Sequence, residues 1–191
     1  MVLPVYVYGM SVLRKVAQEI DEDFEGLNQL IDDMFDTMRD SDGVGLAAPQ
    51  IGKSIRLFMV DASQMEDVDD EPDILSFKKV FINPYIVDER GEKWAFTEGC
   101  LSIPNIREDV MRPSKIKIEY YDRNWEFQEE EYDGVKARII QHEYDHLDGR
   151  LFVDRINPLR RKLLAPRLFA ISKGNVDCDY KIIFSKNKKT G

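Results

Sequence analysis

Cysteine and histidine are scarce in this chain of 191 residues, which contains only two of each. Two cysteines are too few for the disulfide frameworks of small secreted domains, so we expect a cytoplasmic protein with free or metal-bound thiols. No run approaches the roughly 18 apolar residues of a membrane-spanning helix, and the N-terminus lacks the basic leader and long apolar stretch of a signal peptide. We therefore expect no membrane partner.

An excess of basic residues is also lacking. The chain has 27 Lys and Arg against 36 Asp and Glu, a formal net charge of −9, which argues against DNA as a partner. The charge is uneven, however, because residues 155–191 carry a net +8 and the rest of the chain −17. An acidic body followed by a basic C-terminal segment indicates that this segment has its own role in solubility or in binding a polyanion.

The hydrophobic pattern predicts an α+β fold. Apolar residues spaced three and one apart predict an amphipathic N-terminal helix over residues 24–40, capped by Asp23. We expect antiparallel strands packed around a central helix at 135–147, followed by a C-terminal helix that begins at Asn157-Pro158 and a final strand. Residues 1–185 would form one catalytic domain and 186–191 a frayed tail. The predicted strands are 55–60, 80–87, 115–121, 125–132 and 178–184.

The most informative segment lies on the predicted central helix. His142 and His146 are four residues apart, so they project from one face, and Glu143 stands beside the first of them. This HExxH pattern is typical of two imidazoles on one metal ion with a carboxylate that addresses a water. Because these are the only histidines in the chain, the pattern predicts a metal site.

A third protein ligand can be sought by elimination. The position of the third histidine in a longer HExxHxxGxxH motif holds Phe152, and no Glu follows Glu143. Thiolates are then the strongest remaining donors. Cys178 falls in the regular alternation of the predicted final strand, whereas Cys100 follows a glycine that permits an unusual turn. We therefore predict Cys100 as the third ligand.

Three motifs occur in this order: GVGLAAPQIG (residues 43–52), EGCLSIP (98–104) and QHEYDHLDG (141–149). They resemble the three signature motifs of peptide deformylases, and the similarity runs over roughly residues 3–155. The resemblance implies an enzyme that hydrolyses the N-formyl group from the formyl-methionine of newly made polypeptides and releases formate. Nascent formyl-methionyl peptides would be its partners, in the cytoplasm.

The resemblance also implies a role for each matching residue. A divalent ion would be held by three ligands and a water, with Fe²⁺ in the active form and Zn²⁺ possible on isolation. Glu143 would transfer protons between the water and the leaving amine, and the Gln50 side-chain amide and the Leu101 N–H would stabilise the oxyanion. The implied metal ligands are Cys100, His142 and His146.

Further residues are expected to contact the substrate. Gly45, like Gly43, would let the peptide backbone approach closely. An apolar pocket for the methionine side chain is expected beside the metal. Glu98 and Arg112 would form an ion pair that holds the Cys100 loop. The expected pocket residues are Val44, Phe96, Val135 and Ile139.

Two other functions compete with this interpretation. An HExxH metalloprotease would cleave internal peptide bonds but needs a His or acidic third ligand. A structural zinc module would need four protein ligands, with Cys178 as the fourth. For the basic segment 155–191, we hypothesise transient docking on ribosomal RNA through phosphate contacts; the alternative is that its charges only solvate a helix and balance the acidic body.

Overall fold

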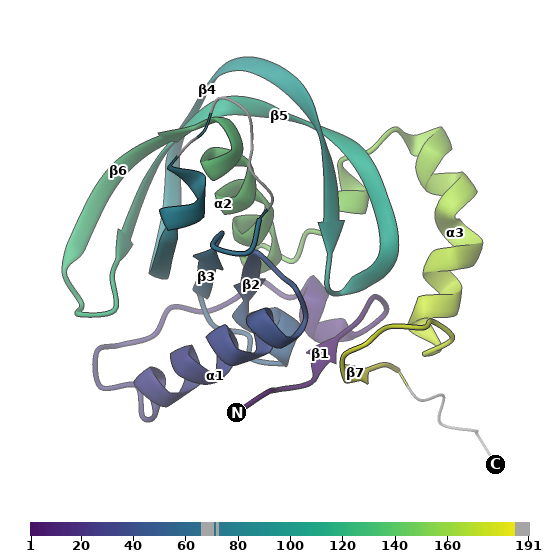
Figure 1. Ribbon diagram of the computed structural model, residues 1–191, viewed down its shortest axis with the longest axis horizontal. Helices are drawn as coiled ribbons and strands as arrows, with labels where there is room; N and C mark the ends of the chain where they lie inside the picture. Colours follow the sequence, from purple (N-terminus) through teal and green to yellow (C-terminus); the bar gives the residue numbers. More distant parts are fainter. Residues whose placement is uncertain (66–70, 72, 186–191) are drawn as a thin grey trace.

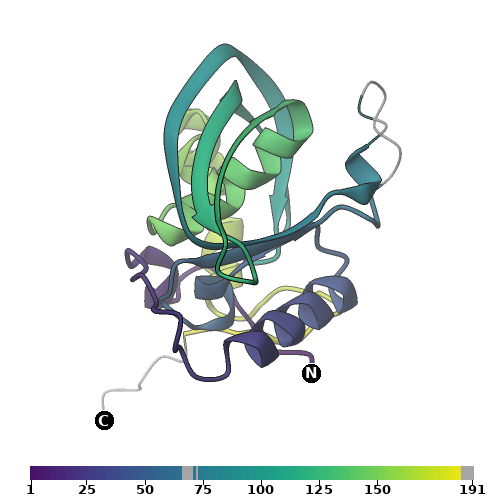
Figure 2. The same cartoon turned by 90° about the vertical axis from the view of Figure 1, so that its left-hand side faces the viewer.

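The computed structural model describes residues 1–65, 71 and 73–185. This part of the chain forms three α-helices, a five-stranded antiparallel sheet in the order β2-β3-β4-β5-β6, and a parallel pair β1-β7 (Figures 1 and 2). The strands are β1 (Val5–Tyr6), β2 (Gly45–Ala47), β3 (Leu57–Asp61), β4 (Lys78–Cys100), β5 (Ile103–Tyr121), β6 (Phe127–Asp133) and β7 (Ile182–Ile183). The helices are α1 (Leu27–Asp40), α2 (Gly134–Leu147) and α3 (Pro158–Ser172), with short 3-10 turns at Ser11–Arg14, Ala48–Ile51, Ile74–Ser76 and Phe152–Asp154. The predicted α+β class, with an antiparallel sheet, is confirmed.

The long hairpin of β4 and β5 gives the sheet its shape. Its ladder runs from Ile82 opposite Tyr121 to Cys100 opposite Ile103, with several irregularities. Because such irregularities bend and twist a strand pair, the hairpin arches over α2 (Figures 1 and 2). Helix α2 contacts β2, β3, β5 and β6. The arch therefore brings the end of β4 close to α2.

Helix α1 packs on β2 and β3, on the side of these strands away from α2 (Figure 1). Its buried stripe includes Leu30, Ile31 and Met34, as the predicted spacing requires. The predicted cap was wrong, because the helix begins after Gly26, which adopts a left-handed conformation and offers no side-chain cap. No helix of the described part is long and apolar enough to cross a membrane.

The structure of the C-terminal part agrees only partly with the elements predicted from the sequence. The Asn157 side chain accepts a hydrogen bond from the Leu159 N–H at 2.8 Å and so caps α3 as predicted. The final strand predicted over 178–184 is reduced to Ile182–Ile183, because the pairing with β1 covers only those two residues. The predicted frayed tail, 186–191, lies outside the described residues.

Candidate metal centre and active site

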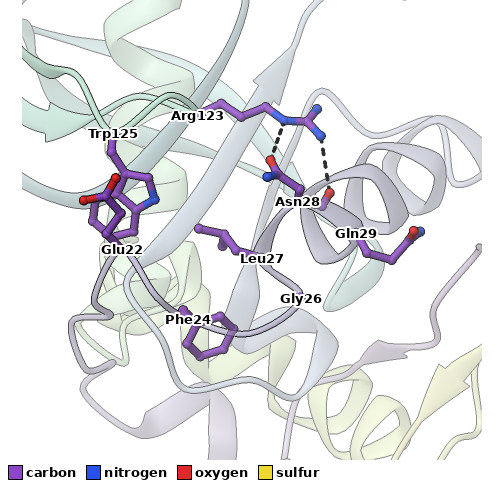
Figure 3. A pocket seen from close by; sticks show the side chains of 8 residues that line it. All are labelled: Glu22, Phe24, Gly26, Leu27, Asn28, Gln29, Arg123 and Trp125. Carbon is purple, nitrogen blue, oxygen red and sulfur yellow. Dashed lines mark hydrogen bonds between the residues drawn. The ribbon is translucent and has the colours of Figure 1, made fainter.

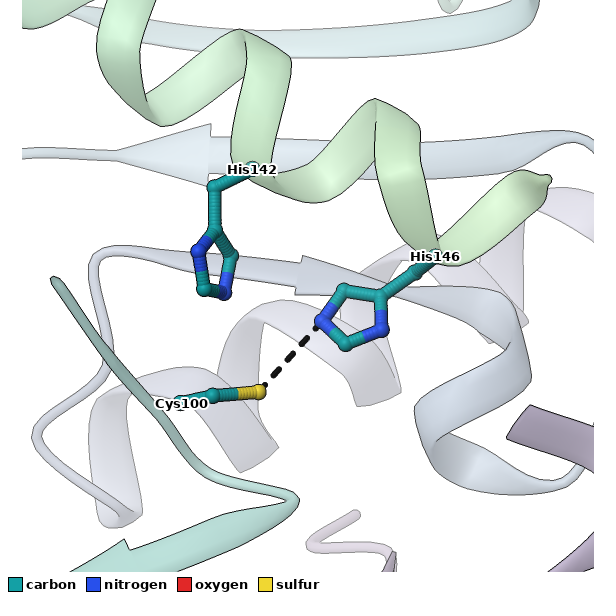
Figure 4. A group of neighbouring side chains, drawn as sticks. All are labelled: Cys100, His142 and His146. Carbon is teal, nitrogen blue, oxygen red and sulfur yellow. Dashed lines mark hydrogen bonds between the residues drawn. The ribbon is translucent and has the colours of Figure 1, made fainter. Parts of the chain in front are cut away.

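The fold brings the three predicted metal ligands together. Cys100 is the last residue of β4, and His142 and His146 project towards it from α2 (Figure 4). Their ligand atoms all lie within 4.8 Å of one another, and Cys100 Sγ is 3.4 Å from His146 Nε2. A thiolate and an imidazole on one tetrahedral zinc ion would stand about 3.5 Å apart, given metal bonds of about 2.3 and 2.0 Å. This donor set therefore fits a divalent transition-metal ion.

His142 is oriented by a buried carboxylate. Its Nδ1 lies 2.8 Å from Glu98 Oε2, which leaves Nε2 available as a metal ligand. Arg112 donates to both oxygens of Glu98 at 2.7 and 2.9 Å, and Arg138 donates a further bond at 3.0 Å. Burial alone would raise the pKa of Glu98, but the hydrogen bonds from Arg112 and His142 hold that pKa well below its usual range. The ion pair expected between Glu98 and Arg112 is present.

The same network ties α2 to the chain that follows it. Asp145 accepts from Arg112 at 2.7 Å and from Arg155 at 2.5 Å. The side chains of Asp145, Arg112 and Arg138 are almost completely buried. Neither Arg138 nor Asp145 was predicted from the sequence as a site residue. Their position on the inner face of the predicted helix could have indicated a role, since charged residues must be paired when they are buried.

Glu143 is buried beside the ligands. Only 4% of its surface is exposed, and its Oε2 has no hydrogen-bond partner among the described residues. Burial raises the pKa of Glu143 to about 7, although the charge of His142 opposes the shift. A carboxyl group with a pKa near neutrality can both accept and release a proton at physiological pH.

Gln50 and Leu101 are both neighbours of Cys100, the first through space and the second along the chain. The Gln50 side chain is 1% exposed, and its carbonyl accepts from the Ala47 N–H at 2.8 Å. This fixes the amide so that its Nε2 lies 3.4 Å from Cys100 Sγ and 3.3 Å from Ser102 Oγ. Among the turn and loop hydrogen bonds of the described residues, none uses the Leu101 N–H as a donor. The Leu101 N–H is therefore able to donate to a substrate, and the Gln50 amide can do so by exchanging its bond to Cys100 Sγ or to Ser102 Oγ.

The expected pocket residues lie in one apolar cluster that includes the inner face of α2. Val135 and Ile139 are buried in it, and Val44 and Phe96 pack against it as half-buried side chains. Two cavities lie elsewhere and are lined by none of these four residues. One, of about 340 Å³, lies at the start of α1 between Phe24 and Trp125 (Figure 3), and the other, of about 440 Å³, includes Arg107 and Arg160.

A thiolate and two imidazoles around a common point, with a buried carboxylate next to them, define a metal-dependent hydrolase site. Residues 2–162 match the polypeptide deformylase family. The chain is 50% identical to a peptide deformylase of Christiangramia forsetii over 99% of both chains, and 47% identical to one of Flavobacterium psychrophilum over 99% of this chain and 100% of the other. A crystal structure of a peptide deformylase from Legionella pneumophila superposes with a TM-score of 0.78 at 37% identity, covering 91% of this chain and 96% of the other.

The chain belongs to the peptide deformylase family. It is therefore a metal-dependent hydrolase that removes the N-formyl group from newly made polypeptides. These matches favour the deformylase interpretation over the metalloprotease and the structural zinc module.

Proposed function

We propose that Cys100, His142 and His146 hold the ion and that Glu143 moves the protons of the reaction. The ion, when bound, activates a water and polarises the formyl carbonyl. The observation that carries this proposal is the convergence of the three ligand atoms within 4.8 Å beside a buried carboxylate. We also propose that residues 1–185 form one catalytic domain, because the ligands, their supports and the C-terminal contacts span that range.

Glu143 acts first as a base and then as an acid. Its carboxylate takes a proton from the attacking water and delivers it to the amine of the departing methionine. Its Oε2 has no hydrogen-bond partner among the described residues, so it is free to take up the proton of the water and to release it again. Burial also excludes bulk water that would compete for the proton.

Two donors stabilise the negative charge that develops on the formyl oxygen. We assign them to the Gln50 side-chain amide and the Leu101 backbone N–H. Gln50 is held in place before substrate arrives by its bond to the Ala47 N–H, so little reorganisation is needed during the reaction. A preorganised donor of this kind contributes about 2.7–4 kcal/mol to the transition state.

The methionine side chain enters the apolar cluster next to α2. We assign its contacts to Val44, Phe96, Val135 and Ile139, all of which face one cluster. Gly45 lies in β2, at the end of the sheet order, where a peptide backbone can approach closely. This arrangement would place the formyl group at the ion and the peptide along β2.

The bound metal in the cell is proposed to be Fe²⁺, with Zn²⁺ as an occupant after isolation. One thiolate and two imidazoles accept either ion, so availability decides between them. An anaerobic assay of formate release from formyl-Met-Ala-Ser, with metal analysis on the same sample, tests both points. Formate release proportional to iron content supports the proposal, and an iron-loaded protein that releases no formate contradicts it.

We also propose that the enzyme acts in the cytoplasm and docks transiently on ribosomal RNA through its basic C-terminal segment. Neither cysteine forms a disulfide, which agrees with the cytoplasm. Helix α3 exposes the basic side chains that docking requires, namely Arg160, Lys162 and Arg167. Phosphate contacts predict ribosome co-sedimentation that weakens steeply with salt. The test variant neutralises Arg160, Arg161, Lys186, Lys188 and Lys189.

A control variant for the docking experiment neutralises three lysines of the long hairpin, Lys93, Lys115 and Lys117. Docking through the C-terminal segment requires that the test variant sediments less with ribosomes than the control at low salt. Both variants should hydrolyse a short formyl peptide at the normal rate. Equal ribosome retention of the two variants at every salt concentration would exclude the docking proposal.

A further inference from the structure

The turn that carries the Leu101 N–H is weakly determined by its own hairpin. Cys100 pairs with Ile103 across the tip, but the next pair is Gly99 with Arg107, so residues 104–106 bulge out of the ladder. The two-residue turns that hairpins favour need a positive φ, and neither Leu101 nor Ser102 has one. The two strands alone therefore do not fix the geometry of this turn.

Two hydrogen bonds from other parts of the chain hold it instead. The Tyr180 hydroxyl donates to the Leu101 carbonyl at 2.7 Å. The Tyr8 N–H donates to the Ser102 carbonyl at 2.8 Å. Both carbonyls of the turn thus accept a bond from outside the hairpin, and one of the donors is a side chain near the C-terminus.

Tyr180 is well placed to act as a fixed support. The chain on its two sides is fastened, because the Asp177 carbonyl accepts from Asn105 Nδ2 at 2.6 Å and the Lys181 carbonyl accepts from the Val5 N–H at 2.9 Å. Figure 1 shows β7 next to β1, near the tip that joins β4 to β5. The backbone is therefore fastened on both sides of Tyr180, so less entropy is lost when its hydroxyl bonds to the turn.

We propose that Tyr180 is a positioning residue for the oxyanion donors, and this rests on the proposed function. Holding the Leu101 carbonyl fixes the turn, and the N–H of the same residue then points at the formyl oxygen. The turn also carries Ser102, whose Oγ lies 3.3 Å from Gln50 Nε2, so the second donor depends on the same support. Tyr180 lies beyond residues 2–162, the part of the chain that matches the family.

The variant Tyr180→Phe removes the hydroxyl and keeps the ring. A neutral hydrogen bond is worth about 0.5–1.5 kcal/mol, so we expect kcat to fall roughly 2.3- to 13-fold with KM within about twofold of the wild type. Metal content and melting temperature should stay close to normal. The matched control is Tyr121→Phe, which removes a hydroxyl from a partly exposed tyrosine on β5 and should leave kcat unchanged. Rescue by 4-aminophenylalanine at position 180, which restores a donor, should recover most of kcat.

A substrate with a thioformyl group separates positioning from general destabilisation. Sulfur accepts hydrogen bonds weakly, so the donors contribute less to the thioformyl reaction than to the formyl reaction. Tyr180→Phe should therefore lower kcat/KM more for formyl-Met-Ala-Ser than for its thioformyl analogue. Equal losses on both substrates, or a kcat within twofold of the wild type, would overturn the proposal.

The same measurements distinguish a failure of the proposed function from a failure of the proposed role of Tyr180. A metal-loaded wild type that releases no formate refutes the proposed function, and the role of Tyr180 falls with it. An active wild type with an equally active Tyr180→Phe variant refutes the role of Tyr180 alone.

Discussion

Removing the charge of Glu98 is expected to damage both the metal site and the fold. In Glu98→Gln, one of the two acceptor oxygens is replaced by an amide nitrogen. Glu98 accepts four bonds, two from Arg112, one from Arg138 and one from His142. One remaining oxygen can keep about two of them, so at least two charge-assisted bonds of roughly 1.5 kcal/mol or more are lost. The expected loss of stability is thus about 3–5 kcal/mol, the range for a broken buried ion pair.

Metal affinity should fall as well, because an amide nitrogen in the place of Oε2 donates to His142 Nδ1 and favours the tautomer with its proton on Nε2, which cannot bind a metal ion. Loss of such a support lowers metal affinity roughly 10- to 100-fold. Urea unfolding and competition with a metal chelator measure the two effects. The control is Asp32→Asn, which breaks an exposed pair with Arg123 and should change neither quantity appreciably. A Glu98→Gln protein with less than about 1 kcal/mol of destabilisation and unchanged metal affinity would refute this reasoning.

Three further outcomes follow from the site and the sheet. Glu143→Gln should keep its metal and lose roughly 10²–10⁴ in kcat, because a proton carrier is removed and a ligand is not; elemental analysis with a formate assay decides this. Cys100→Ala should lose metal or activity, whereas Cys178→Ala, which changes a thiol outside the ligand cluster, should preserve both, and the reverse result would reassign the ligand. Burial alone would raise the pKa of Glu130, but bonds from Lys79 and two tyrosines lower it, so its contribution to stability is present above its unfolded pKa of about 4.3 and is lost as the pH falls towards the lowered value. Urea unfolding across pH 3–7 should therefore show the stability advantage over Glu130→Gln shrinking at acid pH; an advantage independent of pH would contradict the assignment.

The candidate site could be predicted from the sequence because its key spacing is local. His142, Glu143 and His146 lie within five residues of a helix, whose period alone decides which side chains share a face. Cys100 could be found by elimination, since few strong donors exist in the chain. The buried stripe of α1 was equally local, although its cap was not where Asp23 suggested.

The parts that could not be predicted depend on distant partners. Residues 88–97 of β4 are charged and mostly exposed, so the strand predicted from the sequence stops at residue 87, and only pairing with β5 extends it. In contrast, residues 178–184 alternate well but have only a two-residue partner in β1. The residues that support the site could not be predicted for the same reason. Arg138 and Tyr180 form their hydrogen bonds with groups 40 and 79 residues away in the sequence.

Gly45, which was predicted from the sequence to let the substrate approach, also leaves space for the Glu143 side chain. A Cβ at this position would lie 2.4 Å from Glu143 Oε1 and 2.7 Å from its Cδ. The φ of Gly45 is not positive, so alanine is allowed by the backbone and only the collision matters. Glu143 is buried and must be displaced, and a shift of about 1 Å in a catalytic group can cost roughly 100-fold in rate. We therefore expect Gly45→Ala to keep its metal and lose about two orders of magnitude in kcat.

A double-mutant cycle tests whether this loss acts through Glu143. In a Glu143→Gln background, the proton carrier is already absent, so adding Gly45→Ala should cost little more. If instead the two losses in kcat multiply, Gly45 acts mainly on the substrate peptide, and the contact with Glu143 is incidental. Because both variants should retain the ligands Cys100, His142 and His146, metal content on each sample separates either result from a simple loss of the ion.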